Sequence, residues 1–378
     1  MKEGKRATEN YFGVVVMSLA VLLSLIGLLF IYSASNYSAK LQVGDSFFYV
    51  KKQAVALVVG VFGMLSMRYF KIEWIKKYKY VALLVSLIIL VLVFIPKLGV
   101  ESYGAKRWIN LGFFTIQPSE YAKFGLVMFI AAYMSERDMT KLKYMIVVLG
   151  AGLMMCLLII LEPNMSITVC VGAVMLAMLF IGGVKLKRFI IMATPLLIAL
   201  PVMIIIEPYR LKRLTAFINP WETPQAEGYQ LIQSYYALGS GGFFGVGLQN
   251  SRQQYLFLPF SESDFILSII GEETGYFGCL LLMAIFFAFI YFGIKISASA
   301  DTRLKCYLSS GITLIVAIQT VVNIAVVSGT IPPTGLPLPF VSAGGSSLVA
   351  FLLATGLLAK CSNKDGVINR NPKNNKNN

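Results

Sequence analysis

The chain contains no histidine and few charged residues. Of its 378 residues, 13% are Asp, Glu, Lys or Arg and 57% are apolar. The absence of histidine removes the usual base at neutral pH and the commonest transition-metal ligand, so acid–base chemistry falls to carboxylates, Lys or Tyr. The low charge and high apolar content exclude a soluble domain and indicate a polytopic membrane protein.

The cysteines show no paired spacing. They lie in or beside apolar runs, at Cys156, Cys170, Cys279, Cys306 and Cys361. A disulfide framework or a structural zinc site requires clustered or regularly spaced cysteines. We therefore expect small core residues and no dedicated metal site.

Long apolar runs predict an all-α fold of about ten transmembrane helices, in one integral membrane domain over 1–378. A helix crosses a bilayer with about 20 apolar residues. The first run, Tyr11–Tyr32, is uncharged and exceeds the core of a cleavable signal peptide, so we expect it to be retained. The predicted spans are 12–33, 50–67, 78–96, 119–135, 144–161, 166–183, 189–206, 265–294, 306–328 and 343–359.

The distribution of Lys and Arg predicts the orientation. With a cytoplasmic N-terminus, 22 of these residues lie inside and 10 outside, which follows the positive-inside rule. Both termini are then cytoplasmic, and a large loop over 207–264 lies outside. The net charge of +15 is mostly a topology signal and an attraction to anionic lipid, rather than a nucleic-acid-binding surface. We expect the tail 362–378 to be disordered.

Asp264 ends the long outer loop, directly before Phe265-Ile266-Leu267 re-enters the membrane. A carboxylate at this boundary can ionise and still lie in a partly dry pocket. The pattern Ser261-x-x-Asp264 also fits a capping box, in which the carboxylate only accepts a backbone amide. An enzyme outside the cell has no nucleotide pool, so it needs an activated donor, most simply a lipid-linked pyrophosphate.

Other polar groups gather in the predicted outer loops. Lys106, Arg107 and Trp108 are suited either to binding phosphate oxygens or to anchoring the chain at the interface. Arg210 and Arg213 form a second basic cluster, after the seventh span.

Four further features concern the spans and their connections. Glu120 and Lys123 form an i,i+3 pair inside a span, where a lone Lys is costly. Glu272 and Glu273 lie deeper along the eighth span, as functional groups or as partners of a Lys or Arg. Five glycines over 238–248 either cradle phosphate or give the loop mobility. The uncharged, proline-rich turn 329–342 is expected to dip into the protein.

Several segments, in this order, resemble the SEDS family (shape, elongation, division, sporulation), most closely its FtsW/SpoVE branch. The segments are GAKRWINLGFFTIQPSEYAK, YRLKRLTAFINPWETPQAEGYQLIQSYYALGSGGFFGVGLQNSRQQYLFLP, SDFILSIIGEETGYFG and GTIPPTGLPLPFVSAGGSS. The resemblance covers nearly the whole chain. It implies a peptidoglycan glycosyltransferase that polymerises lipid II on the outer face of the bacterial cytoplasmic membrane. Implied partners are a class B penicillin-binding transpeptidase and division or sporulation proteins.

By this resemblance, Asp264 takes the place of the family's essential aspartate and is the expected catalytic base. A divalent cation, Mg²⁺ or Mn²⁺, is expected between Asp264 and the substrate phosphates, with no organic cofactor. The expected substrate-binding residues are Lys106, Arg107, Trp108, Glu120, Lys123, Arg210, Arg213, Gln230, Ser234, Ser346 and Ser347.

The chain departs from the family pattern at Asn164, Ser166, Phe260 and Ala343. Two other functions remain open at this point. One is a lipid II flippase that uses the carboxylates and the Lys inside the spans as a polar path. The other is a non-catalytic scaffold that activates a transpeptidase.

Overall fold

The computed structural model describes residues 2–96, 98–102, 105–110, 112 and 115–363. Each of the ten predicted spans corresponds to one helix, so the all-α polytopic fold is confirmed. The ten helices are α1 (Lys2–Val43), α2 (Phe48–Met67), α4 (Lys79–Leu92), α5 (Pro118–Glu136), α6 (Leu142–Leu161), α7 (Met165–Ile181), α8 (Leu186–Ile206), α11 (Ile266–Ser299), α12 (Arg303–Val327) and α13 (Gly345–Cys361). Most of the predicted disordered tail, 364–378, lies outside the described residues.

By length and composition alone, six of the described helices can cross a membrane, and three more are shorter apolar helices. Helix α8 shows why a bilayer is needed, since Leu197, Ile198 and Ile206 are all exposed. Contiguous apolar surface of this kind is rare on soluble monomers, and lipid tails cover it at no cost.

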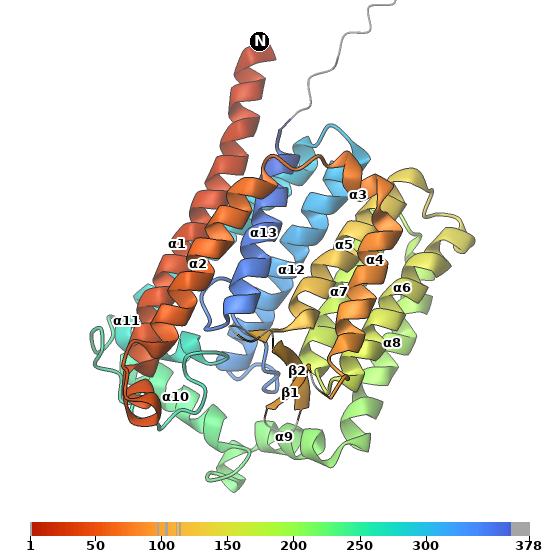
Figure 1. Cartoon of the computed structure of the whole chain (residues 1–378). Coiled ribbons are helices and arrows are strands. Elements are labelled where there is room, and N and C mark those ends of the chain that lie inside the picture. The colour runs from red at the N-terminus through yellow and green to blue at the C-terminus, as the bar shows by residue number, and fades with distance from the viewer. Residues whose placement is uncertain (1, 97, 103–104, 111, 113–114, 364–378) are drawn as a thin grey trace, which may run out of the picture.

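All the remaining elements except α3 (Glu73–Lys77) lie at one end of the bundle, which we call the loop end (Figure 1). The N-terminus, α3 and the end of α13 lie at the opposite end. The loop-end elements are β1 (Gly99–Ser102), β2 (Ala105–Asn110), β3 (Thr115–Ile116), α9 (Pro208–Ile218), the 3₁₀ helix Pro220–Glu222 and α10 (Tyr229–Gly241). The strands form a small antiparallel sheet in the order β1-β2-β3, where the sequence analysis expected only a loop.

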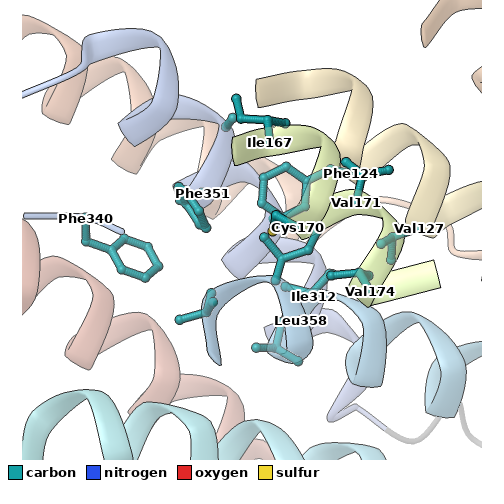
Figure 2. Close-up of a cluster of buried hydrophobic side chains, with 14 of the residues drawn as sticks. Phe124, Val127, Ile167, Cys170, Val171, Val174, Ile312, Phe340, Phe351 and Leu358 are labelled. Carbon is teal, nitrogen blue, oxygen red and sulfur yellow. The ribbon is translucent and has the colours of Figure 1, made fainter. Parts of the chain in front are cut away.

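The core lies where α5, α7, α12 and α13 meet (Figure 2). The rings of Phe124 and Phe351 contact edge-to-face, with centroids 5.3 Å apart. Phe340, from the turn before α13, lies 5.3 Å from the Phe351 ring on its other side. Because lipid tails are as apolar as these side chains, close packing rather than the hydrophobic effect holds helices together in a bilayer.

Helix α11 is broken at Gly275, whose φ of 68° and ψ of −167° are not helical. Residues 242–247, which we call the strap, lie along this break. The N–H groups of Tyr276 and Phe277 donate to the carbonyls of Gly242 and Phe243, at 2.9 and 3.1 Å. The carbonyls of the strap therefore accept hydrogen bonds from amides that lost their helical partners at the break.

The strap also donates to the carbonyls before the break. The amides of Val246 and Gly247 donate to the carbonyl oxygens of Glu272 and Glu273, at 3.0 and 3.1 Å. A Cβ on Gly245 would stand 2.1 Å from the Glu273 carbonyl oxygen, so the close approach requires glycine. The predicted phosphate cradle finds no support here, because these strap amides are bonded to protein carbonyls.

The carboxylates of Glu272 and Glu273, just before the break at Gly275, bind neighbouring segments through hydrogen bonds. Glu272 accepts hydrogen bonds from the Ser251 hydroxyl and from the Arg252 amide, the latter at 3.0 Å. Glu273 accepts from the Ser33 hydroxyl of α1. Both side chains are buried. Among the described residues, neither forms the salt bridge that the sequence analysis considered.

We expect Gly275→Ala to destabilise the protein by about 1–3 kcal/mol, because L-residues pay that much to hold an unfavourable backbone conformation. The new Cβ would also stand 2.4 Å from the Gly245 amide. Thermal unfolding of the detergent-solubilised variant measures this effect.

The matched control is Gly150→Ala in α6, where an added Cβ meets nothing within 4 Å. Alanine is the better helix former, so this variant should be as stable as the parent or more so. Equal melting temperatures for Gly275→Ala and the parent would contradict the role given to the break.

Candidate active site

Asp264 stands at the loop end, directly before α11, and is half-buried. The N-cap of α11 is Phe265, and no side chain makes a capping hydrogen bond. Ser261 donates to the carbonyl of Ala34 instead, at 3.3 Å. The capping-box interpretation of Asp264 is therefore wrong.

The proline-rich turn 329–342 holds Asp264 in place, and the prediction that this turn dips into the protein is confirmed. The side-chain amide of Asn323 in α12 donates both to the Asp264 carbonyl, at 2.9 Å, and to the Leu336 carbonyl, at 2.8 Å. Gly335 has a φ of +71°, and a Cβ there would stand 3.2 Å from Asp264 Oδ2. A glycine at the tip of this turn thus leaves space for the carboxylate.

The end of the turn is tied to the residues just before Asp264. The Ser342 hydroxyl donates to the Ser263 carbonyl, and the Ala343 amide donates to the Glu262 carbonyl at 2.8 Å. Leu336, Leu338 and Phe340 of the turn are also buried. Asp264 thus sits between two interlocked segments that are far apart in the chain.

Arg107 of β2 acts electrostatically on Asp264. Because successive side chains of a strand alternate, Arg107 shares its face with the buried Ile109, whereas Lys106 is exposed. The guanidinium donates to the carbonyls of Glu162 and Pro163, in the turn between α6 and α7. These contacts orient a positive charge that acts on Asp264.

Arg213 of α9 is the second cation that acts on Asp264. Its guanidinium carbon lies 4.8 Å from the ring centroid of Tyr209, one turn earlier in the same helix. Arg210 donates instead to the Met203 carbonyl of α8, at 3.1 Å. Arg107 and Arg213 thus lie close enough to Asp264 to act on its charge, whereas Arg210 has a partner elsewhere.

Burial raises the pKa of Asp264 from its ordinary 3.8 to about 6. Arg213 and Arg107 oppose this rise because they favour the charged form, and Glu262 adds to it. A base with a pKa near the working pH combines a large ionised fraction with useful proton affinity. Asp264 meets both conditions at neutral pH.

Glu162 is a second carboxylate close to Arg107. Its side chain is fully buried, and neither carboxylate oxygen has a hydrogen-bond partner among the described residues. Burial raises its pKa from 4.5 to about 8, although Arg107 opposes the rise. Glu162 is therefore mostly protonated at neutral pH.

A buried network lies between α5, α12 and α13. Lys123 donates to Glu120 Oε2 and to Gln319 Oε1, both at 2.8 Å. The Ser347 hydroxyl donates to the same Glu120 oxygen at 2.7 Å. The Lys123 ammonium also lies 4.4 Å from the ring centroid of Phe351. The predicted Glu120–Lys123 pair is confirmed, and its geometry fixes the helices that carry the turn 329–342.

The other predicted substrate-binding residues are placed as follows. Ser234 is fully buried and bonds to Ser268 of α11 at 2.8 Å and to the Val327 carbonyl. Ser346 accepts the Gln117 amide at 3.0 Å, at the start of α5. Trp108 and Gln230 are both half-buried at the loop end. Their contact with substrate stays a prediction.

No group of three or more His, Cys, Asp or Glu side chains among the described residues is arranged to bind a metal ion. Asp264 offers an oxygen ligand near the Arg107 and Arg213 side chains. A cation here would need ligands from the substrate's own phosphates, as Mg²⁺ often takes in phosphate-binding sites.

Two residues of the site, Glu162 and Asn323, are absent from the residues predicted from sequence. For Glu162 a signal was present, since it follows α6 at the loop end, where the basic residues of β2 also lie. For Asn323, no local pattern indicates that it lies beside Asp264.

We expect Glu162→Gln to stabilise the protein increasingly as pH rises. The unfolded chain releases the Glu162 proton near pH 4.5, whereas the folded protein keeps it until about pH 8. Between these pH values, the protein with Glu162 therefore loses folding stability as pH rises. The gain should be near zero at pH 4.5 and on the order of 3 kcal/mol at pH 7. Thermal unfolding at both pH values measures it.

Glu222→Gln, at an exposed position of the same end, is the control and should show no such trend. If Glu162→Gln stabilised the protein equally at both pH values, ionisation of the buried Glu162 would be excluded as the source of the added stability.

The fold and the site together define a class: a multi-pass helical membrane protein whose polar loop end holds a half-buried Asp under the influence of two Arg side chains. The chain matches the family described as cell cycle protein, FTSW_RODA_SPOVE, over residues 14–366. It belongs to this family, as the resemblance in its sequence predicted.

Curated relatives span nearly the whole chain. Stage V sporulation protein E of Bacillus subtilis (strain 168) is 36% identical over 92% of this chain and 96% of its own length. A probable peptidoglycan glycosyltransferase FtsW of Geobacter sp. (strain M18) is 35% identical over 95% and 98%. That of Trichlorobacter lovleyi is 37% identical over 93% of each chain.

Solved structures share the fold. One, described as "Structural coordination of polymerization and crosslinking by a peptidoglycan synthase complex", matches with a TM-score of 0.77 and 23% identity over 92% of this chain and 96% of the other. The rod shape determining protein RodA of Thermus thermophilus matches with a TM-score of 0.68 and 22% identity, over 92% and 95%.

Proposed function

We propose that this protein is a peptidoglycan glycosyltransferase that polymerises lipid II on the outer face of the bacterial cytoplasmic membrane. Relatives named as such enzymes match over nearly their full length. The observation that carries the proposal is the half-buried Asp264, whose pKa is raised by burial and whose charge Arg213 and Arg107 stabilise.

Asp264 acts as the general base. The C4 hydroxyl of the acceptor sugar attacks the anomeric carbon of the donor, and Asp264 Oδ takes the hydroxyl proton. The bond between the anomeric carbon and the pyrophosphate oxygen breaks, and undecaprenyl pyrophosphate leaves with the electron pair. A single displacement inverts an α-linked donor into a β-linked product.

Arg107 and Arg213 stabilise the leaving group. The pyrophosphate gains negative charge as the bond breaks, and cations held in a poorly solvated site stabilise that charge strongly. Arg107 is well suited, because its hydrogen bonds to the α6–α7 turn hold it before substrate arrives. A divalent cation, Mg²⁺ or Mn²⁺, would add to this neutralisation, held by substrate phosphates and Asp264.

Glu120, Lys123 and Ser347 position the site. Lys123 and Glu120 are buried and pair with each other, and they also bond to Gln319 of α12 and Ser347 of α13. They fix the helices on both sides of the turn that carries Gly335. This arrangement favours a polymerase over a flippase, which would need such charges along a hydrophilic route across the membrane.

Partners follow from the same proposal. The solved synthase complex couples polymerisation to crosslinking. A class B penicillin-binding transpeptidase, within division or sporulation machinery, fits this chain by its relatives. Both termini lie in the cytoplasm in this proposal, as the charge distribution favours.

We expect Asp264→Asn to lower the polymerisation rate by about 10²-fold or more, because general bases contribute about 10²–10⁴-fold. In the unsubstituted protein, the rate should fall about tenfold per pH unit below about pH 6, where Asp264 is protonated. Gel analysis of polymer made from labelled lipid II between pH 5 and 8 measures both.

Glu262→Gln is the matched control, two residues from the base. This variant should make polymer, with the acid limb moved to lower pH, because the charge of Glu262 raises the pKa of Asp264. Polymer from Asp264→Asn at the unsubstituted rate would remove Asp264 from the chemistry.

A second test separates polymerase from flippase. Lipid II supplied only to the leaflet that faces the loop end should be polymerised without crossing the membrane. Impermeant labelling of Asn250→Cys and Lys187→Cys, both exposed positions, fixes the orientation of the protein in each vesicle.

Asn250→Cys should react from outside the cell and Lys187→Cys from inside, with the protein lacking either change as the labelling control. Transfer of labelled lipid II between leaflets without any polymer would establish the flippase instead.

A further inference from the structure

Gln53 is a buried polar residue of α2 that the proposed mechanism does not use. It lies in the second turn of the helix, and its side chain is only 4% exposed. A glutamine amide carries both donors and an acceptor, and inside a bilayer these groups must find partners within the protein. The partners of Gln53 therefore show which part of the protein it holds.

Both ends of the Gln53 amide bond to one short segment, residues 342–344, which we call the clamp. Nε2 donates to the Ser342 carbonyl at 3.3 Å, and Oε1 accepts from the Gly344 amide at 3.1 Å. The clamp joins the proline-rich turn to the start of α13. Because the side-chain amide is planar, these two bonds fix both the position and the orientation of the clamp relative to α2.

The clamp in turn bonds to the two residues before Asp264. The Ser342 hydroxyl donates to the Ser263 carbonyl at 2.6 Å, and the Ala343 amide donates to the Glu262 carbonyl at 2.8 Å. A continuous series of hydrogen bonds therefore leads from α2, through the clamp, to the backbone that carries Asp264.

Helix α2 is a firm support for this series, because it packs closely along α13 (Figure 1). An added Cβ on Gly60 would stand 2.5 Å from Leu352 Cδ1, and one on Gly356 would stand 2.3 Å from the Met64 carbonyl oxygen. Small residues that allow such an approach are typical of helix pairs in membranes. Gln53 lies on the same face of α2, two turns before Gly60.

We propose that Gln53 is a positioning residue for the reaction: it holds the clamp, and through the clamp it fixes the Asp264 carboxylate where the acceptor hydroxyl loses its proton. The inference rests on the proposed function. Gln53 does not touch the substrate. Its two bonds also go to neither Arg107 nor Arg213, so it acts on the base and not on the groups that stabilise the leaving group.

Gln53→Met tests this role, because it removes both hydrogen bonds and keeps a side chain of similar length. We expect kcat for polymerisation to fall about 10–100-fold, since a displacement of about 1 Å at a reacting group can cost about 10²-fold. The KM for lipid II should stay near that of the unsubstituted protein, because Arg107 and Arg213 keep their supports.

The pH profile separates positioning from a loss of folded protein. Burial raises the pKa of Asp264 to about 6, and a displaced Asp264 is less buried, so the acid limb of the rate should move to lower pH. A variant that only folds less well loses rate in proportion at every pH and keeps its acid limb where it was.

Ser342→Ala tests the route through the clamp, because it removes the hydroxyl that donates to Ser263. If Gln53 acts along this route, Gln53→Met and Ser342→Ala interrupt the same series of bonds. The double variant should then lower kcat by little more than the larger single effect. Single effects that multiply in full would overturn the route.

Labelling at position 264 measures the same displacement without any polymerisation. A small thiosulfonate reagent should modify the thiol of Asp264→Cys several-fold faster when Gln53→Met is also present, because the loosened clamp admits water and reagent. Mass spectrometry of the labelled peptide separates this thiol from the native cysteines.

Gln254→Met is the matched control. Gln254 is 2% exposed, and its side-chain amide donates to the Gln249 carbonyl at 2.8 Å, within its own loop. This variant also loses the hydrogen bond of a buried glutamine, but it leaves the clamp intact. Its kcat, its acid limb and the labelling rate at position 264 should match those of the unsubstituted protein.

An unmoved acid limb together with an unchanged labelling rate in Gln53→Met overturns the positioning role. If Gln53→Met does not accumulate in the membrane, the same two measurements on Ser342→Ala decide the question, since that variant opens the clamp from its other side. Absence of polymer from the unsubstituted protein overturns the proposed function instead, and the labelling rates alone then decide whether Gln53 holds Asp264.

Discussion

A bilayer supplies no hydrogen-bond partners, so every irregular backbone segment of this protein must find partners inside the protein. The break at Gly275 and the turn 329–342 both meet this constraint. The strap bonds to amides and carbonyls on both sides of Gly275. Asn323 and Ser342 bond to the turn and to the residues around Asp264. The loop end is consequently a connected structure, in which moving one segment exposes polar groups in another.

The same packing creates the chemistry. Segments that satisfy one another also exclude water, and burial raises the pKa of Asp264 far above that of an exposed Asp. Arg107 and Arg213 limit this rise, so the carboxylate still ionises near neutral pH. A base of useful strength is therefore a consequence of how the loops are held, not of Asp264 alone.

The sequence was sufficient for the spans, because runs of about 20 apolar residues reflect membrane thickness directly. It also predicted Asp264 as the catalytic residue, through its place at a membrane boundary and the family resemblance, and this role stays a prediction. It could not give the strap or the partners of Glu272, since these depend on contacts between segments that local patterns do not encode. The alternation of side chains along β2 explains why Arg107 shares a face with the buried Ile109. A strand of two residues, such as β3, leaves little periodic signal in the sequence.

The charge balance at the site depends on Asn164 and Glu162. Asn164 is one of the departures from the family pattern, and its side chain caps α7 by accepting the Ile167 amide. Asn caps a helix as well as Asp does and carries no negative charge. Glu162 is mostly protonated at neutral pH because burial raises its pKa to about 8. Arg107 and Arg213 both act electrostatically on Asp264. The Asp264 carboxylate carries one negative charge against these two cations, so a polyanionic pyrophosphate would find positive charge at the site.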